Sequence, residues 1–346
     1  MPRTLVTGGA GFVGSSLGIK LKKQFTGVQI IALDNLSRPG SELNLPRLED
    51  AGIQFVKGNV CEKRDFEEVG AFDLLIDAAA ECSVQAGLNS NPENVFSTNI
   101  SGTFNSLEAA RKHNASFLFI STSRVYPIAA LNSLPYEEGK TRFILQGLSG
   151  ITEDFPLNGA RSLYGATKLS GELLIQEYAY NYGLKTIINR CGIIAGPWQM
   201  AKSDQGVITL WAAHFTYGLP LRYIGFGGLG KQVRDVLHID DFSDLICRQI
   251  TLPEAWNGNI FNVGGGIACS TSLLELSTIC REITGQKISM DSVPETSPVD
   301  IRIYLSDLHK VKAGFGWVPT KNVSQTVSDT VAWLNDYKSA LSGVIQ

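Results

Sequence analysis

The sequence predicts an α/β protein in which a doubly wound parallel sheet is joined to a smaller C-terminal domain. A glycine-rich turn directly follows the first apolar run of the chain. Further short apolar runs then alternate with helical patterns, which is typical of a parallel sheet with helical crossovers. The length of 346 residues suits one large or two medium domains with a substantial core.

The first turn has the glycine spacing of a dinucleotide-binding site. The apolar run 4–6 is a predicted strand, and Gly8, Gly11 and Gly14 precede a helical pattern. Gly8 permits a tight turn, Gly11 lets the backbone approach a diphosphate, and Gly14 lets the helix pack on the strand. Free N–H groups of the first helical turn would face the anion. We expect contacts with the cofactor from Gly8, Gly11, Phe12, Val13 and Gly14.

Asp34 indicates which dinucleotide is bound. It ends the second predicted strand, 28–33, about 20 residues past the glycines, where a carboxylate can accept hydrogen bonds from a ribose. A carboxylate there repels a 2′-phosphate, so NAD is favoured over NADP. Arg38 leaves NADP open, because a nearby arginine can accommodate that phosphate. Asn35, Ser37 and Arg38 of the following loop are further expected cofactor contacts.

The carboxyl ends of the later strands should complete a crevice for the ligand. Three more strands are predicted at 53–56, 72–77 and 117–120, with helices at 65–69 and 95–113 between them. The alanines 78–80 suit close approach to a ligand or ordinary packing, and Asn99 could pin a loop or face solvent. We expect the cofactor crevice to include Asn59, Val60, Ala78, Ala79, Ala80, Asn99 and Ser121.

Tyr164 and Lys168 form the predicted acid–base pair. They open a helix that runs to about Asn181 and lie four residues apart, on one helix face. An ammonium beside the phenol lowers the pKa of the phenol and can also bind a ribose. Such a phenol can take and return a hydroxyl proton while a hydride moves to nicotinamide. Thr122 would add a hydrogen bond to the reacting oxygen.

These motifs together resemble the extended short-chain dehydrogenase/reductase family. The matching features are GGAGFVG at 8–14, the acidic end of the second strand, Ser121-Thr122 and YGATK at 164–168. The resemblance implies a Rossmann-type sheet, bound NAD and a nucleotide-linked sugar as substrate. It also implies that Arg234 and Arg302 contact the diphosphate of that substrate. Further substrate contacts are expected from Thr122, Ser123 and Gln205.

Finer features favour one subgroup of this family. The segments 34–38, 141–143, 204–207 and 230–238 resemble enzymes that invert C2 of a CDP-linked 3,6-dideoxyhexose through a transient keto sugar. Three residues depart from the usual pattern, which has Gly-Gln at 80–81, Asp at 59 and Gly at 127. They are Glu81, Asn59 and Pro127, and Glu81 would lie near the nicotinamide ribose.

The family also implies a division of the chain. Residues 1–190 would form the NAD-binding domain, with 236–258 packing back on it. Residues 191–235 and 259–346 would form the substrate-binding domain, and the sugar would lie in the cleft between them. Family members often pair through their long helices, so we expect a dimer or tetramer.

Three other functions remain open. A nucleotide-sugar 4-epimerase needs the same phenol, and pocket shape decides which carbon faces the nicotinamide. A 4,6-dehydratase needs an acid–base couple, usually Asp-Glu, where this chain has Ser123-Arg124. A non-catalytic NAD-binding regulator is the third possibility, although such proteins commonly lose the Tyr or the Lys of the pair.

The bulk composition excludes several classes. A net charge of −3 gives no polycationic face for nucleic acid or an anionic membrane. No apolar run is long enough for a membrane span, and residues 1–7 lack the pattern of a signal peptide, so we expect neither feature. Six cysteines without regular spacing indicate reduced thiols and a cytoplasmic protein. The four scattered histidines have no ligand spacing, so we predict no metal.

Overall fold

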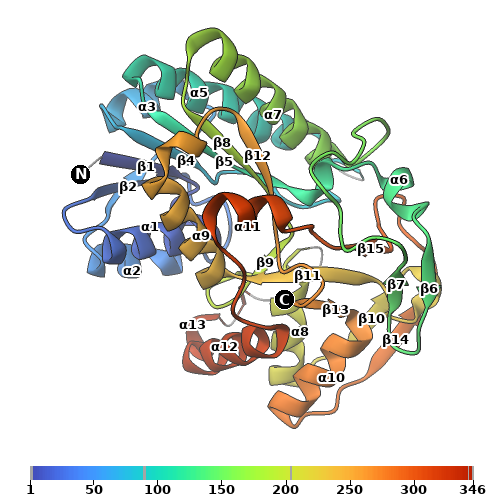
Figure 1. Ribbon diagram of the computed structural model, residues 1–346. Coiled ribbons are helices and arrows are strands. Elements are labelled where there is room, and N and C mark those ends of the chain that lie inside the picture. Colours follow the sequence, from blue (N-terminus) through green and yellow to red (C-terminus); the bar gives the residue numbers. More distant parts are fainter. Residues whose placement is uncertain (1–2, 89–90, 203–204, 342, 345–346) are drawn as a thin grey trace.

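The computed structural model describes residues 3–88, 91–202, 205–341 and 343–344. In this part of the chain the largest element is a seven-stranded sheet in the order β12-β8-β5-β4-β1-β2-β3 (Figure 1). Every neighbouring pair in it is parallel. This confirms the predicted α/β class and the Rossmann-type sheet. The strands are β1 (Arg3–Thr7), β2 (Gln29–Asp34), β3 (Gln54–Lys57), β4 (Leu74–Asp77), β5 (Ser116–Thr122), β8 (Thr186–Cys191) and β12 (Asn259–Val263).

Helices cover both faces of this sheet, because its apolar strands are buried on both sides (Figure 1). One face packs against α1 (Phe12–Gln24), α9 (Ile239–Thr251) and α11 (His309–Phe315). The other packs against α3 (Lys63–Val69), α5 (Gly102–His113) and α7 (Leu163–Tyr182). The helix ending in α5 begins as α4 (Glu93–Phe96) and passes through a π-helical segment, η2 (Ser97–Ser101).

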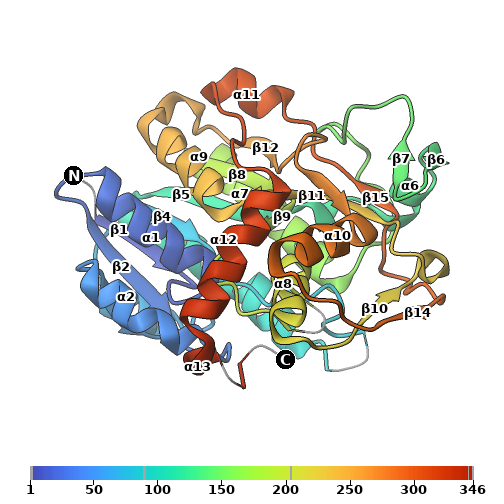
Figure 2. The ribbon, with the colours of Figure 1, turned by 90° about the horizontal axis from the view of Figure 1, so that it is seen from below.

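The smaller part of the molecule lies beyond the carboxyl ends of these strands (Figure 2). Its sheets are short, and a second apolar core lies among α8, α10 and α12. Among the described residues, no helix is long and apolar enough to cross a membrane. The strands are β9 (Ile193–Ala195), β10 (Leu221–Ile224), β11 (Val233–His238), β13 (Ser270–Ser272), β14 (Met290–Val293) and β15 (Ile303–Tyr304), with the hairpin β6 (Tyr136–Glu138) and β7 (Phe143–Leu145) beside them. The other helices are α2 (Leu45–Asp50), α6 (Ile128–Asn132), α8 (Val207–Tyr217), α10 (Leu273–Thr284), α12 (Val323–Asp336) and α13 (Lys338–Leu341).

One predicted boundary is wrong. Residues 259–263 were expected in the smaller domain, but as β12 they pair with β8 and form the edge strand of the central sheet. Phe261 and Val263 of this strand are buried in the core that also contains α1 and α9. The short strand is held by its neighbour in the sheet rather than by residues close to it in sequence. The rest of the predicted division stays a prediction.

A buried polar network ties α7 to the sheet. Glu172 of α7 and Arg190 of β8 form an ion pair of 2.8 Å, with side chains only 1% and 3% exposed. The Ser121 hydroxyl donates to Glu172 at 2.5 Å, and Arg190 donates to the Tyr126 hydroxyl at 3.2 Å. Tyr126 in turn donates to Asn262 of β12 at 2.8 Å. The network thus joins α7, β5, β8 and β12.

Arg190→Met should strongly destabilise the protein, because it leaves the Glu172 carboxylate buried without its counter-charge. Removing one partner of a buried ion pair costs about 3–5 kcal/mol. Urea unfolding followed by circular dichroism would measure this loss. The exposed pair Arg111–Glu108 offers a matched control, since Arg111→Met removes the same type of charge at the surface. Equal midpoints for the two variants would contradict the prediction.

A second ion pair joins the β6–β7 hairpin to the start of α10. Arg142 pairs with Glu275, and Thr141 Oγ1 donates to the same carboxylate at 2.7 Å. Glu275 also accepts the Ser272 N–H at 3.0 Å and so completes a capping box. Burial alone would raise the pKa of Glu275, but these partners lower it to about 2.

Glu275→Gln should therefore cost stability at neutral pH and little in strong acid. The folded-state pKa of about 2 lies below the ordinary value of 4.5, so the carboxylate stabilises the fold at neutral pH. That contribution is lost as the pH falls through the interval between these two values. The urea midpoint of the wild type should fall more over this interval than that of Glu275→Gln. Glu282→Gln, exposed on the same helix, should follow the wild type; parallel curves for Glu275→Gln and the wild type would refute the prediction.

Candidate active site

The turn between β1 and α1 contains the close backbone approaches that its glycines predict. Gly8 has a φ of 62°, in the left-handed region, and a Cβ on it would lie 2.8 Å from the Ala78 carbonyl oxygen. A Cβ on Gly14 would overlap the carbonyl oxygen of Gly8. The turn and the start of α1 can therefore lie against the loop after β4. This leaves a cradle that side chains would fill and that suits a diphosphate.

A cavity of about 1290 Å³ extends from this turn along the carboxyl ends of β1, β2, β4 and β5 into the smaller part of the molecule. The cavity is larger than the roughly 300–1,000 Å³ of a typical pocket for one small ligand, so it has room for a cofactor and a substrate together. Of the predicted site residues, Lys168, Asn99 and Arg302 do not line it. Those that do are Gly8, Gly11, Phe12, Val13, Gly14, Asp34, Asn35, Ser37, Arg38, Asn59, Val60, Ala78, Ala79, Ala80, Ser121, Thr122, Ser123, Tyr164, Gln205 and Arg234.

Asp34 is fixed by backbone N–H groups at the end of β2. Its carboxylate accepts the N–H of Ala10 at 3.1 Å and that of Leu36 at 2.8 Å. Burial raises the pKa of this carboxyl, and the backbone hydrogen bonds oppose that rise. The carboxylate lines the cavity beside the glycine turn. This donor and acceptor set fits the ribose of NAD, although the contact itself stays a prediction.

Arg38 donates its guanidinium hydrogen bonds to protein atoms, which leaves it less free to bind a phosphate. Its guanidinium donates to Gln205 Oε1 at 2.6 Å and to the Met200 carbonyl oxygen. Both partners lie in the segment before α8, more than 160 residues along the chain. An arginine committed in this way is a poorer partner for a 2′-phosphate, which removes the main argument for NADP. Asp204, also part of a resemblance motif, lies outside the described residues.

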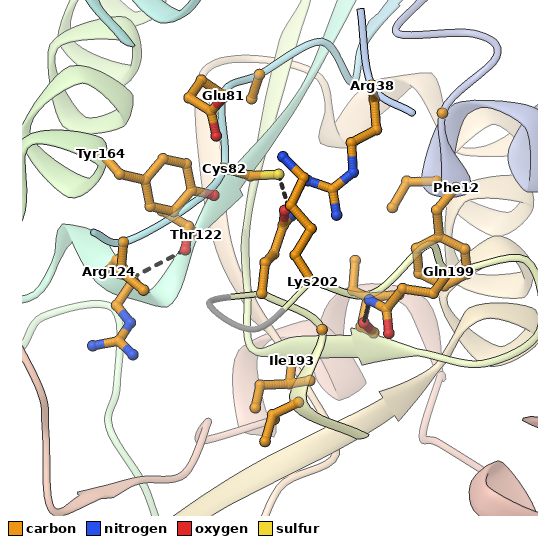
Figure 3. A pocket seen from close by; sticks show the side chains of 18 of the residues that line it. Phe12, Arg38, Glu81, Cys82, Thr122, Arg124, Tyr164, Ile193, Gln199 and Lys202 are labelled. Atoms are coloured by element: carbon orange, nitrogen blue, oxygen red, sulfur yellow. Dashed lines mark hydrogen bonds between the residues drawn. The ribbon is translucent and has the colours of Figure 1, made fainter. Parts of the chain in front are cut away.

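Tyr164 lies in the cavity at the end of β5, close to Thr122 (Figure 3). The helix α7 begins just before it, where the Ser162 hydroxyl caps the Gly165 N–H at 3.1 Å. Burial raises the pKa of Tyr164, while the hydrogen bond from Thr122 and the charge of Arg124 lower it. Tyr164 and Thr122 therefore meet as predicted, with a phenol that is protonated at neutral pH.

Lys168 does not line the cavity, and its place beside the phenol stays a prediction. It is 1% exposed, and its ammonium lies 3.7 Å from the centre of the Phe119 ring. Burial lowers the pKa of Lys168, and the Asp77 carboxylate is the leading opposing charge. Asp77 is itself held by Thr7 Oγ1 at 2.6 Å. The ammonium is thus balanced by a buried carboxylate behind the cavity wall.

Two predicted cofactor residues are used to hold the cavity wall. Asn99 is buried and donates to the Glu81 carbonyl and to Thr167 Oγ1, both at 3.0 Å, while accepting the Glu81 N–H at 2.9 Å. It pins the loop after β4 to α7, which was one of its two predicted roles, and it does not line the cavity. The Ser121 hydroxyl is directed to Glu172. The Ser121 hydroxyl proton is therefore not available to a ligand.

Arg234 of β11 lines the cavity from the smaller part of the molecule. It donates to Asp300 Oδ1 at 2.9 Å, to the Ile301 carbonyl at 2.6 Å, to the Val233 carbonyl at 2.8 Å and to the Arg302 carbonyl at 3.5 Å. Burial lowers the pKa of Arg234 to about 10, and Asp300 opposes that shift. Most of its donors are therefore already satisfied by the protein.

The structure gives no support to the predicted contact between Arg302 and a diphosphate. The Arg302 guanidinium donates to the Asn132 carbonyl at 3.0 Å and does not line the cavity. It stacks on aromatic rings, a cation–π arrangement that joins the hairpin to the turn after β10. The distances to the ring centres are 4.2 Å for Tyr136, 5.3 Å for Phe226 and 5.7 Å for Phe143.

Several cavity residues were not predicted from the sequence. Cys82, Arg124 and Lys202 line the cavity, and Cys82 Sγ accepts a hydrogen bond from the Gln205 amide (Figure 3). Cys82 lies two residues after the predicted strand end at 78–80, so extending the expected cavity lining by two residues would have included it. Lys202 comes from a segment without periodicity, and no local signal marks it.

Cysteine and histidine form no evident metal centre. All six cysteines are free thiols. Among the ranges that the structure describes, no group of three or more His, Cys, Asp and Glu side chains could hold a metal ion.

Glu81 accepts the Ser83 N–H at 3.1 Å and a hydrogen bond from Asn94 at 3.4 Å, which holds its carboxylate near the cavity wall.

Comparison with known proteins gives consistent matches over almost the whole chain. A model described as the NAD dependent epimerase/dehydratase family matches residues 4–264. CDP-paratose 2-epimerase from Salmonella typhi is 31% identical, over 96% of this chain and 98% of that protein. A dTDP-glucose 4,6-dehydratase from Mycobacterium tuberculosis is 28% identical over 97% and 94% of the two chains. The crystal structure of Thermus thermophilus UDP-glucose 4-epimerase in complex with NAD superposes with a TM-score of 0.80, at 26% identity over 96% of this chain and 99% of that chain.

Asp34→Ser should shift the dinucleotide preference toward NADP. The variant removes the carboxylate that repels a 2′-phosphate, so the ratio of the dissociation constants for NADP and NAD should fall about tenfold. Titration of each dinucleotide followed by tryptophan fluorescence would measure both constants. Asp50→Ser, an exposed position on α2, serves as the matched control. An unchanged ratio in Asp34→Ser would show that the carboxylate does not face the ribose.

Proposed function

The chain belongs to the NAD-dependent epimerase/dehydratase family, and on that basis we propose that it is a CDP-sugar 2-epimerase that converts CDP-paratose to CDP-tyvelose. NAD is its cofactor. The support for C2 of a CDP-linked 3,6-dideoxyhexose is the similarity to CDP-paratose 2-epimerase, which extends over 96% of the chain. The structural observation that carries an epimerase reaction is the position of Tyr164 and Thr122, in one cavity with the glycine turn and Asp34.

The proposed reaction uses one phenol as base and then as acid. Bound NAD would supply a hydride acceptor for the oxidation at C2 and a hydride donor to the other face of the transient keto sugar, so that none is consumed. The Tyr164 oxygen takes the proton of the sugar hydroxyl and later gives it back, while Thr122 donates a hydrogen bond to the same region. Burial raises the pKa of Tyr164, so the phenolate needs a nearby positive charge to form. The nicotinamide ring of bound NAD would supply such a charge. Arg234 stays the predicted contact for the substrate diphosphate.

Neighbouring side chains argue against elimination of water. A 4,6-dehydratase protonates a leaving hydroxyl, and its family pattern has Asp-Glu after the threonine. Here Ser123 and Arg124 line the cavity at these positions, and neither supplies a carboxylic acid. A 4-epimerase would need no such acid and stays the main alternative, in line with the likeness to a UDP-glucose 4-epimerase structure. The presence of Tyr164 in the cavity argues against a purely regulatory NAD-binding protein.

We further propose a cytoplasmic homo-oligomer, a dimer or tetramer, formed through the two long helices. Large apolar side chains are exposed along α5 and α7 on the same face of the central sheet. A second copy of the chain would cover these side chains, because exposed apolar patches commonly mark protein–protein interfaces. The exposed residues are Phe104, Leu173, Tyr180 and Tyr182. Free thiols fit a reducing compartment.

Incubating the protein with CDP-paratose should give CDP-tyvelose, identified by nuclear magnetic resonance of the C2 proton. Tyr164→Phe should lower kcat about 10²- to 10⁴-fold, the range for loss of a general acid–base group. Tyr337→Phe removes the same hydroxyl from a phenol distant in sequence and should leave turnover unchanged. Inversion at C4 of UDP- or CDP-sugars without inversion at C2 would refute the assignment. Retained turnover in Tyr164→Phe would refute the role of the phenol.

A further inference from the structure

Arg124 is an arginine of the cavity wall whose hydrogen-bonding capacity the protein leaves largely unused. It lies in the short turn η3 (Ser123–Val125), lines the cavity, and its guanidinium donates to the Val299 carbonyl oxygen at 3.1 Å. Among the described residues this is the one hydrogen bond that its side chain makes. A guanidinium has five N–H donors, so most of them remain available. Arg234, by contrast, makes four hydrogen bonds to protein atoms.

Arg124 lies between the phenol and the arginine predicted to hold the diphosphate. The charges that act on its pKa, which burial lowers, are those of Asp300 and Tyr164. Asp300 is also the ion-pair partner of Arg234 at 2.9 Å. Figure 3 shows the backbone of Arg124 next to Thr122 and near Tyr164, with the Arg124 guanidinium extending away from the phenol at the cavity wall. A ligand that reaches from Tyr164 to Arg234 therefore passes Arg124.

Local backbone packing fixes this position. Thr122 Oγ1 accepts the Arg124 N–H at 3.2 Å, which begins the η3 turn. A Cβ on Gly165 would overlap the carbonyl oxygen of Arg124, so η3 and the first turn of α7 are in direct backbone contact. The backbones that carry Arg124 and Tyr164 are therefore fixed against each other.

We propose that Arg124 binds the phosphate attached to C1 of the sugar and thereby selects C2 as the carbon that reacts. This inference rests on the proposed epimerase function. In a nucleotide sugar, C2 is bonded directly to C1, whereas C4 lies across the ring from it. A cation on the same cavity wall as the phenol would hold the C1 phosphate close to that wall, which would bring the C2 hydroxyl within reach of the phenol and keep C4 farther from it.

The chemistry of arginine fits this role. Its planar fork can bind two phosphate oxygens at once. It stays protonated at physiological pH and cannot act as a general acid, so it holds the sugar without protonating a leaving hydroxyl. Its charge also opposes the rise that burial causes in the pKa of the Tyr164 phenol.

The test compares Arg124→Gln and Arg124→Lys with the wild type, using the NAD-loaded protein. Calorimetry would give the dissociation constants of CDP and CMP, which differ by the terminal phosphate. Arg124→Gln should weaken CDP roughly 10- to 100-fold, the loss expected for one charged hydrogen-bonding partner, and leave CMP nearly unchanged. Arg124→Lys should recover part of the loss. Arg281→Gln, exposed on α10, should match the wild type.

Turnover of CDP-paratose provides the second readout. In Arg124→Gln, kcat/KM for inversion at C2 should fall by at least the factor lost in CDP binding, and Arg124→Lys should restore part of it. Equal losses for CMP and CDP, or C2 inversion at the wild-type rate in Arg124→Gln, would overturn the inference and leave the epimerase assignment intact. A wild-type protein that inverts only C4 would overturn the proposed function, and with it selection of C2, whatever the two nucleotides show.

Discussion

The buried ion pair between Glu172 and Arg190 sets the geometry of the site. It fixes α7 against β8, and Ser121 of β5 joins the same carboxylate. Tyr164 stands two turns earlier on α7, so the register set by Glu172 decides where the phenol meets the end of β5. A buried ion pair adds little net stability compared with apolar packing. Its contribution here is one defined position of the helix on the sheet.

Close backbone contacts then bring separate segments around the cavity. The Gly8 turn lies against the loop after β4, and Gly165 lets the start of α7 touch the carbonyl oxygen of Arg124. Asn99 holds the same loop after β4 to Thr167 of α7. The wall of the cavity is thus built from short polar and backbone contacts. A rigid wall of this kind keeps reacting groups in place, which favours catalysis by orientation.

The charges are divided between the wall and the cavity. Lys168 and Asp77 balance each other behind the wall, while Arg38 is held by Gln205 and the Met200 carbonyl. Arg302 is enclosed by aromatic rings. Arg124, which lines the cavity, makes one side-chain hydrogen bond to the protein and keeps most of its donors for a ligand. This division explains why counting basic residues in the sequence cannot say which of them binds the substrate.

Local signals were enough to predict the β1–α1 turn, the strand that ends at Asp34 and the helix that begins before Tyr164, because glycine spacing and apolar periodicity can be recognised within a short window. Strand β8 could not be predicted from local signals, because its Asn189 and Arg190 are polar and yet buried. Their partners, Gln249 and Glu172, lie 60 and 18 residues away in the chain. The place of β12 in the central sheet, and the use of Arg38 and Arg302 by protein groups, became evident only from the folded chain. The cause is the same in each case: a side chain's role depends on partners that the fold supplies from 18 to more than 160 residues away.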